Sequence, residues 1–111
     1  MAFERVCAPE DVPTDEGLAV VVGDLEVVVA RGGEEFFALQ NLCSHAAVPL
    51  SEGEVEDCQI ECWLHGSRFD LRSGKPTGLP ATEPVAAFPV DIRPDGVYVD
   101  TSVTLNGVRP S

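Results

Sequence analysis

The sequence predicts an all-β fold, built as an antiparallel sandwich or open barrel of short strands. Short stretches rich in valine, leucine, isoleucine and phenylalanine recur along the chain, and turn-forming residues separate them; the chain holds ten glycines and nine prolines. β-Branched and aromatic residues favour strands, and clusters of glycine and proline end them. No stretch repeats its apolar residues with the period of a long helix. Together these observations are typical of a sandwich or barrel.

The first half of the chain is expected to supply four strands. Residues 3–7 alternate apolar and charged side chains, which predicts the first strand. Residues 18–22 and 25–30 flank Gly23-Asp24, a two-residue hairpin signal, so they are expected to pair. Residues 35–40 follow a turn at residues 31–34 and predict the fourth strand. Cys7 is interpreted as a small core residue.

The second half is predicted to contain shorter elements. Pro49 limits residues 46–50 to one helical turn, and residues 51–53 form a turn. Residues 54–61 are read as one strand, on which Cys58, Ile60 and Cys62 face the same side, so that Cys58 is a core residue rather than a metal ligand. The remaining expectations are a strand at 68–71, an irregular loop at 76–84, a hairpin of strands 85–92 and 97–100, and a frayed tail at 106–111.

The length of 111 residues suits one domain, spanning residues 1–111. Nineteen acidic and seven basic residues give a net charge of −12, which argues against binding nucleic acid or an anionic membrane. An acidic group in the middle of the chain is either a solvated edge or a docking face for a basic partner. Its members are Glu52, Glu54, Glu56, Asp57 and Glu61.

The sequence indicates a cytoplasmic protein. Residues 1–5 already include two charged side chains and do not resemble a secretion signal. The apolar span 18–30 is interrupted and too short to cross a bilayer. With four cysteines in such a setting, metal binding is a better interpretation than a disulfide framework.

Four residues form a complete set of metal ligands. Cys43 and His45 lie in one short segment, and Cys62 and His65 lie in another. Zinc fingers usually pair two cysteines in one loop and two histidines elsewhere. Here each segment offers one thiolate and one imidazole, which suits two irons that take the two kinds of ligand separately. A structural zinc site stays open as the alternative.

These segments, Cys43-Ser44-His45 and Cys62-Trp63-Leu64-His65-Gly66, resemble the C-x-H and C-x-x-H motif of Rieske [2Fe–2S] proteins. The resemblance covers essentially the whole chain. It is closest to the small ferredoxins of bacterial multicomponent non-haem iron (aromatic-ring-hydroxylating) oxygenases.

The resemblance implies a Rieske (ISP-like) fold, in which an antiparallel base carries an inserted cluster-binding subdomain at about residues 41–82. It further implies one [2Fe–2S] cluster, with Cys43 and Cys62 on the inner iron and His45 and His65 on the outer iron. The segment Gly78-Leu79-Pro80 is similar to the proline-containing loop that covers the cluster, so Pro80 is expected beside it.

Two departures from the respiratory members of this superfamily point to a low reduction potential. Those members carry an extra cysteine in each cluster loop, whereas Leu64 and residues 46–48 supply none here. They also place a tyrosine two residues after the loop serine, whereas Phe69 follows Ser67 here and is interpreted as a core residue. Fewer hydrogen bonds to the ligand sulfurs lower the potential.

Two neighbours of the ligands have open roles. Ser67 either caps its loop or donates a hydrogen bond to a cluster sulfide, and Trp63 either shields the loop or lies at a docking face.

The function that the resemblance implies is that of an electron carrier, not an enzyme. A flavin-containing, NAD(P)H-dependent ferredoxin reductase would supply single electrons, and a terminal non-haem iron oxygenase would receive them. We expect a monomer. A Rieske ferredoxin serving iron–sulfur assembly or redox sensing, and a zinc-binding module, are the alternatives.

Overall fold

The computed structural model describes residues 3–32, 35–42, 48–62, 66–77 and 83–108. Within these residues the paired strands are antiparallel, and the helices are short 3-10 turns. The elements are β1 (Glu4–Cys7), η1 (Pro9–Asp11), β2 (Leu18–Val22), β3 (Leu25–Gly32), β4 (Glu35–Gln40), η2 (Leu50–Glu52), β5 (Val55–Glu56), β6 (Gln59–Glu61), β7 (Arg68–Asp70), β8 (Ala87–Phe88), β9 (Val90–Arg93) and β10 (Gly96–Val99). The predicted all-β antiparallel fold is confirmed.

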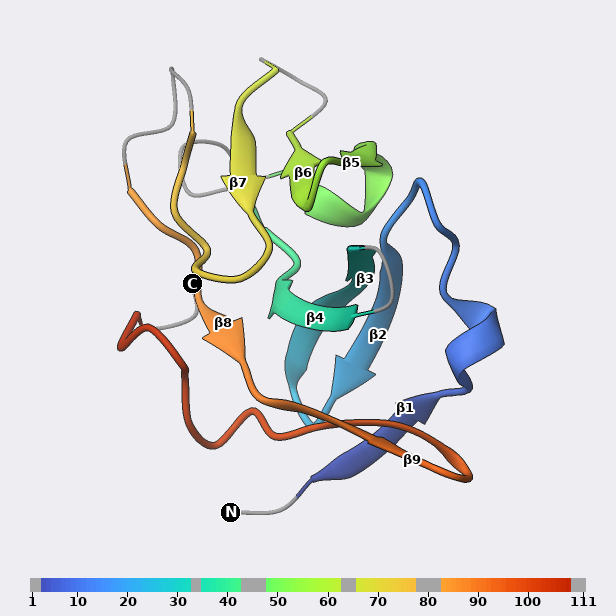
Figure 1. The fold of residues 1–111 in the computed structure, drawn as a ribbon. Coiled ribbons are helices and arrows are strands. Elements are labelled where there is room, and N and C mark those ends of the chain that lie inside the picture. The colour runs from blue at the N-terminus through green and yellow to red at the C-terminus, as the bar shows by residue number, and fades with distance from the viewer. Residues whose placement is uncertain (1–2, 33–34, 43–47, 63–65, 78–82, 109–111) are drawn as a thin grey trace.

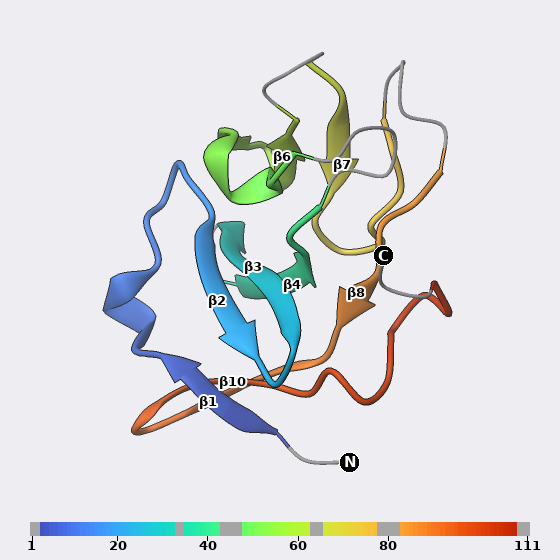
Figure 2. The same cartoon turned by 180° about the vertical axis from the view of Figure 1, so that it is seen from behind.

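The strands form three layers (Figure 1). A four-stranded sheet in the order β2-β3-β4-β8 lies in the middle. On one side of it is the sheet β1-β10-β9, and on the other is the small sheet β5-β6-β7. Figure 2 shows the same order from behind, with β1 and β10 crossing below the middle sheet and β6 and β7 above it.

Strand β3 explains why the middle sheet lies between two others. Its residues Val27, Val28, Val29 and Ala30 are each no more than 1% exposed, so both faces of the strand are covered. Alternate residues of a strand point to opposite faces. Accordingly, Val27 and Val29 pack in the core toward β1 and β10, whereas Val28 and Ala30 pack in the core toward β5–β7.

The two cores hold different residues. The core toward the small sheet also contains Leu39, Leu50, Val55, Ile60, Cys62, Phe69, Leu71, Val85 and Ala87. The core of the other two layers also contains Cys7, Val12, Val22, Ala38, Ala86, Phe88, Val97 and Val99. The predicted core positions of Cys7 and Phe69 are therefore confirmed.

The hairpin of β2 and β3 forms as predicted. Val22 pairs with Leu25 across the two-residue turn, in which Gly23 has a φ of +64°. That left-handed conformation suits the twist of a tight hairpin and costs glycine little. Strand β3 runs to Gly32, two residues beyond the predicted end.

The single strand predicted at residues 54–61 is wrong. The chain instead forms a hairpin, in which Glu56 pairs with Gln59 and the turn consists of Asp57 and Cys58, with φ of 53° and 61°. Two adjacent positive φ values are the geometry of a tight hairpin turn that usually carries Asn-Gly or Asp-Gly. Cys58 therefore does not share a strand face with Ile60, although it packs at the margin of that core.

The single strand predicted at residues 85–92 is also wrong. Strand β8 pairs with β4 in the middle sheet, whereas β9 pairs with β10 in the outer sheet. Pro89 lies between them and has no backbone N–H for a sheet hydrogen bond. The chain changes layers at this residue.

Two smaller predictions need correction. A helical turn occurs at Leu50–Glu52, where only a turn was expected, and follows Pro49 rather than containing it; residues 46–47 of the predicted turn lie outside the described residues. The tail was expected to fray from residue 106, but Asn106 hydrogen-bonds Ser73 and Val85, and Val108 packs against the core. Residues 109–111 lie outside the described residues.

Candidate metal centre

The structure describes one of the four predicted ligands, Cys62. Cys43, His45 and His65 lie outside the described residues, as do Trp63 and Pro80. What the structure does describe is the framework at both ends of three segments, which are the two that carry the predicted ligands and the one around Pro80 that is predicted to cover the cluster.

The second ligand segment leaves β6 at Cys62 and returns at Gly66. The Cys62 amide donates to the Ser67 carbonyl oxygen at 2.6 Å, and the Gly66 amide donates to the Cys62 carbonyl oxygen at 2.8 Å. Gly66 has a φ of +76°, a conformation that side-chain-bearing residues rarely adopt. The backbone conformation at position 66, directly after the predicted ligand His65, thus favours glycine.

Burial changes sharply across this segment. Cys62 and Ser67 are each 0% exposed, whereas Gly66 between them is exposed. The thiol of Cys62 belongs to the core that also contains Ile60 and Phe69. A buried soft sulfur donor at the inner end of a loop that reaches the surface fits a cluster with an inner, thiolate-bound iron.

The first ligand segment is anchored by side chains that the sequence analysis missed. Gln40 is 2% exposed; its Oε1 accepts from the Ala86 amide at 3.0 Å and its Nε2 donates to the Leu42 carbonyl oxygen at 2.9 Å. Asn41 is 6% exposed, and its Oδ1 accepts from the Ser51 amide at 2.8 Å. The amide of Asn41 ties the start of the segment to the chain beyond its end. The sequence did contain one sign of this anchoring, since two amide side chains, Gln40 and Asn41, stand directly before the predicted ligand segment.

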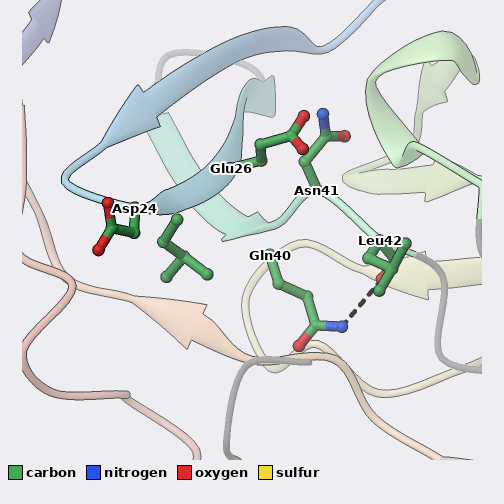
Figure 3. A pocket seen from close by; sticks show the side chains of 6 residues that line it. Asp24, Glu26, Gln40, Asn41 and Leu42 are labelled. Carbon is green, nitrogen blue, oxygen red and sulfur yellow. Dashed lines mark hydrogen bonds between the residues drawn. The ribbon is translucent and has the colours of Figure 1, made fainter.

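A cavity of about 150 Å³ opens beside the start of this segment. Its lining residues are Asp24, Leu25, Glu26, Gln40, Asn41 and Leu42. Figure 3 shows Gln40 reaching toward Leu42 and the carboxylates of Asp24 and Glu26 on the side of the β2–β3 hairpin.

The covering segment is anchored on β7. The Thr77 amide donates to the Arg68 carbonyl oxygen at 2.8 Å, and Phe69 and Pro76 form an isolated antiparallel bridge. At the other end, the Val85 amide donates to the Gly74 carbonyl oxygen at 2.8 Å. One described end of this segment therefore lies against β7, and the other lies against the turn that follows β7.

Arg72 joins the small sheet to the middle sheet. Its guanidinium donates two hydrogen bonds to the Glu35 carboxylate, at 2.9 and 3.0 Å, and lies over the Phe37 ring. The hydrogen bonding to Glu35 raises the pKa of Arg72, so the cation persists at any physiological pH. Burial raises the pKa of the neighbouring Cys58 thiol, which favours an inert core role for that cysteine.

The acidic group is exposed as the sequence analysis expected, apart from the half-buried Glu61, whose carboxylate lies 3.7 Å from Arg68. Within the described part of the chain the other members have no ion-pair partner; they are Glu52, Glu54, Glu56 and Asp57. These carboxylates lie on η2, on β5 and in the turns beside them, next to the layer that contains Cys62.

Two absences hold for the described residues. No three His, Cys, Asp or Glu side chains there gather closely enough to hold a metal ion. No helix among them has the length and apolar character that a membrane crossing requires.

Comparison with known proteins identifies the family. Residues 2–89 match the model of the Rieske [2Fe-2S] domain. The chain is 42% identical over 100 residues to the ferredoxin component of biphenyl 2,3-dioxygenase from Rhodococcus jostii strain RHA1, covering 90% of this chain and 94% of that protein.

Solved structures agree with the sequence comparison. The ferredoxin of carbazole 1,9a-dioxygenase from Nocardioides aromaticivorans IC177 superimposes with a TM-score of 0.84 at 37% identity, covering 89% of this chain and 97% of that chain. A complex of reduced oxygenase and oxidized ferredoxin in carbazole 1,9a-dioxygenase matches with a TM-score of 0.80 at 35% identity, covering 87% of this chain and 91% of that chain.

These matches confirm the family that the ligand motif predicted, and with it the Rieske fold and the iron–sulfur cofactor. The relatives of this chain are named as ferredoxin components, which are electron carriers and not catalytic subunits. The chain belongs to the Rieske [2Fe–2S] family, and within it is a ferredoxin that carries one [2Fe–2S] cluster and transfers electrons.

Proposed function

We propose that this ferredoxin takes single electrons from a flavin-containing, NAD(P)H-dependent ferredoxin reductase and delivers them to the terminal non-haem iron oxygenase of an aromatic-ring dioxygenase system. The observation that carries the proposal is the 42% identity, over 90% of the chain, to the ferredoxin component of a biphenyl dioxygenase. The match to a ferredoxin in complex with its oxygenase supports the choice of the electron acceptor.

Cys43, His45, Cys62 and His65 would hold the cluster. The burial of Cys62 supports its place on the inner iron, and the exposure of Gly66 directly after His65 supports an outer iron near the surface. When bound, the cluster supplies a one-electron redox centre whose histidine ligation raises the potential above that of four-cysteine clusters. The chain's own contribution would be to bury Cys62 on the thiolate side, while the exposed Gly66 next to His65 would allow a partner to approach.

The organisation follows from the same proposal. The chain is one domain, 1–111, with a cluster-binding subdomain at about residues 41–82. The core shared by Val28 and Ile60 supports one domain, because the small sheet covers a face of β3 rather than closing on a core of its own. The chain acts as a monomer in the cytoplasm.

Reconstituted electron transfer tests the proposal. The purified protein should contain two irons and two acid-labile sulfides, and its reduced form should give the EPR spectrum of a histidine-ligated [2Fe–2S] cluster. Mixed with NADH, the reductase and the oxygenase of the Rhodococcus biphenyl system, it should support oxidation of biphenyl.

The matched control is the Cys62→Ser variant, which should support no turnover in that mixture. A wild-type protein that carries the cluster and is reduced, but passes electrons to no aromatic-ring oxygenase, would contradict the proposed acceptor.

A further inference from the structure

The side chain of Asn106, in the C-terminal tail, hydrogen-bonds to two other chain segments and to the tail itself. Its Nδ2 donates to the carbonyl oxygens of Ser73 and Val85, each at 2.8 Å. Its Oδ1 accepts from the amides of Ala87 and Val108, each at 3.3 Å. One half-buried amide therefore connects the turn after β7, the strand leading into β8, and the tail itself.

The oxygen and the nitrogen of this amide bond to different parts of the chain. The acceptor bonds, with the 2.7 Å bond from the Leu105 amide to the Ala87 carbonyl oxygen, attach the tail to β8. The donor bonds join Ser73 to Val85, which are twelve residues apart in the sequence. A single substitution that keeps the oxygen and removes the nitrogen can separate these two roles.

The contact is closely fitted. Gly74 has a φ of +73°, and a Cβ there would lie 2.8 Å from Asn106 Nδ2 and closer still to the Val85 carbonyl oxygen. The Val85 amide already donates to the Gly74 carbonyl oxygen, and the Gly74 amide to that of Asp70, each at 2.8 Å. Asn106 adds its donor bonds to an existing backbone pairing, so that both sides of the junction are held.

This junction adjoins two segments that lead into the proposed metal centre. On one side it continues into β7, whose first residue follows Ser67, the backbone partner of Cys62. On the other side it holds Val85, which closes the segment that starts at Thr77. Figure 1 shows the tail returning on the side of β8, and the bond of Asn106 to Ser73 joins it to the turn that follows β7.

We propose that Asn106 is a positioning residue for the cluster: its amide nitrogen clamps Ser73 to Val85 and so holds β7, the strand that follows Cys62 and Ser67, in its place. The inference rests on the proposed ligand set. The tail of this ferredoxin is thus a structural part of the metal centre, although it is more than forty residues from the nearest ligand in the sequence.

The test is the Asn106→Asp variant, loaded with cluster. The aspartate keeps an oxygen for Ala87 and Val108, loses both donor bonds, and places a carboxylate against two carbonyl oxygens. We expect its cluster to be lost to a chelator about tenfold faster, since each lost hydrogen bond removes stabilisation of the junction. Hydrogen exchange by mass spectrometry should rise in peptides that cover residues 70–77 and 83–88, and the reduction potential should shift.

Two controls separate positioning from general stability. Leu105→Ala alters a 64% exposed neighbour of Asn106 and should retain the cluster as the wild type does. Val27→Ala opens a cavity in the other core and should lower the unfolding temperature with little effect on cluster loss. If Asn106→Asp loses its cluster no faster than a Val27→Ala protein of equal unfolding temperature, the proposal is overturned.

A measurement on the wild-type protein keeps the inference testable even if no variant folds. In the cluster-loaded protein, residues 104–108 should exchange their amide hydrogens as slowly as residues 70–77 and 83–88. Faster exchange of the tail alone would overturn the inference. A wild-type protein without iron and sulfide would instead contradict the proposed function.

Discussion

The amide of Cys62 donates a hydrogen bond to the carbonyl oxygen of Ser67 at 2.6 Å, which joins the two ends of the segment between them. Both residues are fully buried. The proposed thiolate ligand, Cys62, is therefore held at the buried end of the segment, and the following predictions depend on that geometry.

Replacing Cys62 by serine should abolish cluster binding, because a hydroxyl is a poor ligand for iron in a site built for a thiolate. Iron and sulfide content and the visible absorption of the purified variant measure this. Cys58→Ser is the matched control, since Cys58 lies in the nearby hairpin turn and is expected to bind no iron. Loss of the cluster in both variants would contradict the assignment of Cys62 as the ligand.

Replacing Ser67 by alanine tests its proposed hydrogen bond to a cluster sulfide. If that bond favours the reduced cluster by about 1 kcal/mol, its loss lowers the potential by about 40 mV, as measured by voltammetry. Ser67 is 0% exposed, so alanine fills nearly the same space. An unchanged potential in a stable, fully loaded variant would show that the serine acts only in the loop structure.

Gly66→Ala should destabilise the protein by about 1 kcal/mol, because alanine strains at a positive φ. Chemical unfolding measures that change. Gly23→Ala is a close control: Gly23 has a φ of +64° against +76° at Gly66, and at both positions a Cβ would meet no atom of the described residues within 4 Å, chain neighbours aside. The two variants should lose similar stability, but only Gly66→Ala should lose its cluster faster.

The stability of the outer layer should depend on pH through Asp100. The hydroxyl of Ser102 and its backbone amide both donate to Asp100 Oδ1, at 2.5 and 2.9 Å, and they hold the pKa of this carboxyl below its ordinary value of 3.8. A carboxyl whose pKa is lower in the folded state stabilises the fold above its unfolded pKa, and that contribution disappears as pH falls through the folded value.

The Ser102→Ala variant should therefore be less stable than the wild type at pH 7. The difference in unfolding free energy should narrow as pH falls below about 4. Because both proteins carry the same cluster ligands, acid effects on the cluster cancel in the comparison. A difference that stays constant down to pH 2 would contradict the role of the Asp100 charge.

The exposed carboxylates of Glu54 and Glu56 should speed docking to a basic partner. The double variant Glu54→Gln/Glu56→Gln should be reduced several-fold more slowly by the reductase at low ionic strength, and the difference should vanish at high salt. Glu10→Gln and Asp11→Asn, on η1, remove the same charge elsewhere and serve as the control. Equal effects in the two double variants would show that the acidic group is a solvated edge and not a docking face.

The parts of the fold that the sequence predicted well are those with explicit turn chemistry. Gly23-Asp24 located the β2–β3 hairpin, whose strands begin where expected. By contrast, Asp57-Cys58 makes an equally tight turn without glycine, so no turn motif in the sequence predicted it. The change of layer at Pro89 depends on which sheets meet there, which no local pattern records.

The candidate site divides in the same way. Ligand chemistry was readable from Cys43, His45, Cys62 and His65, because metal binding needs particular side chains at particular spacings. The bonding partners of the supporting side chains could not be predicted: Gln40 bonds to Ala86, and Asn106 bonds to Ser73 across 33 residues. Such bonds depend on how the chain folds back, and an isolated asparagine in a polar tail gives no sign of them.

Strand β3 offers a route to hybrid ferredoxins. Val28 and Ala30 face the small sheet β5–β7, whereas Val27 and Val29 face the opposite core. The two sides of this one strand can therefore be redesigned separately. A β5–β7 layer transplanted from a relative needs to match Val28, Ala30, Leu39 and Ala87 of the recipient's middle sheet, and to keep the bonds of Arg72 to Glu35 and of Asn106 to Ser73. The recipient's own base, with its surface charges, can then be kept while the redox properties are exchanged.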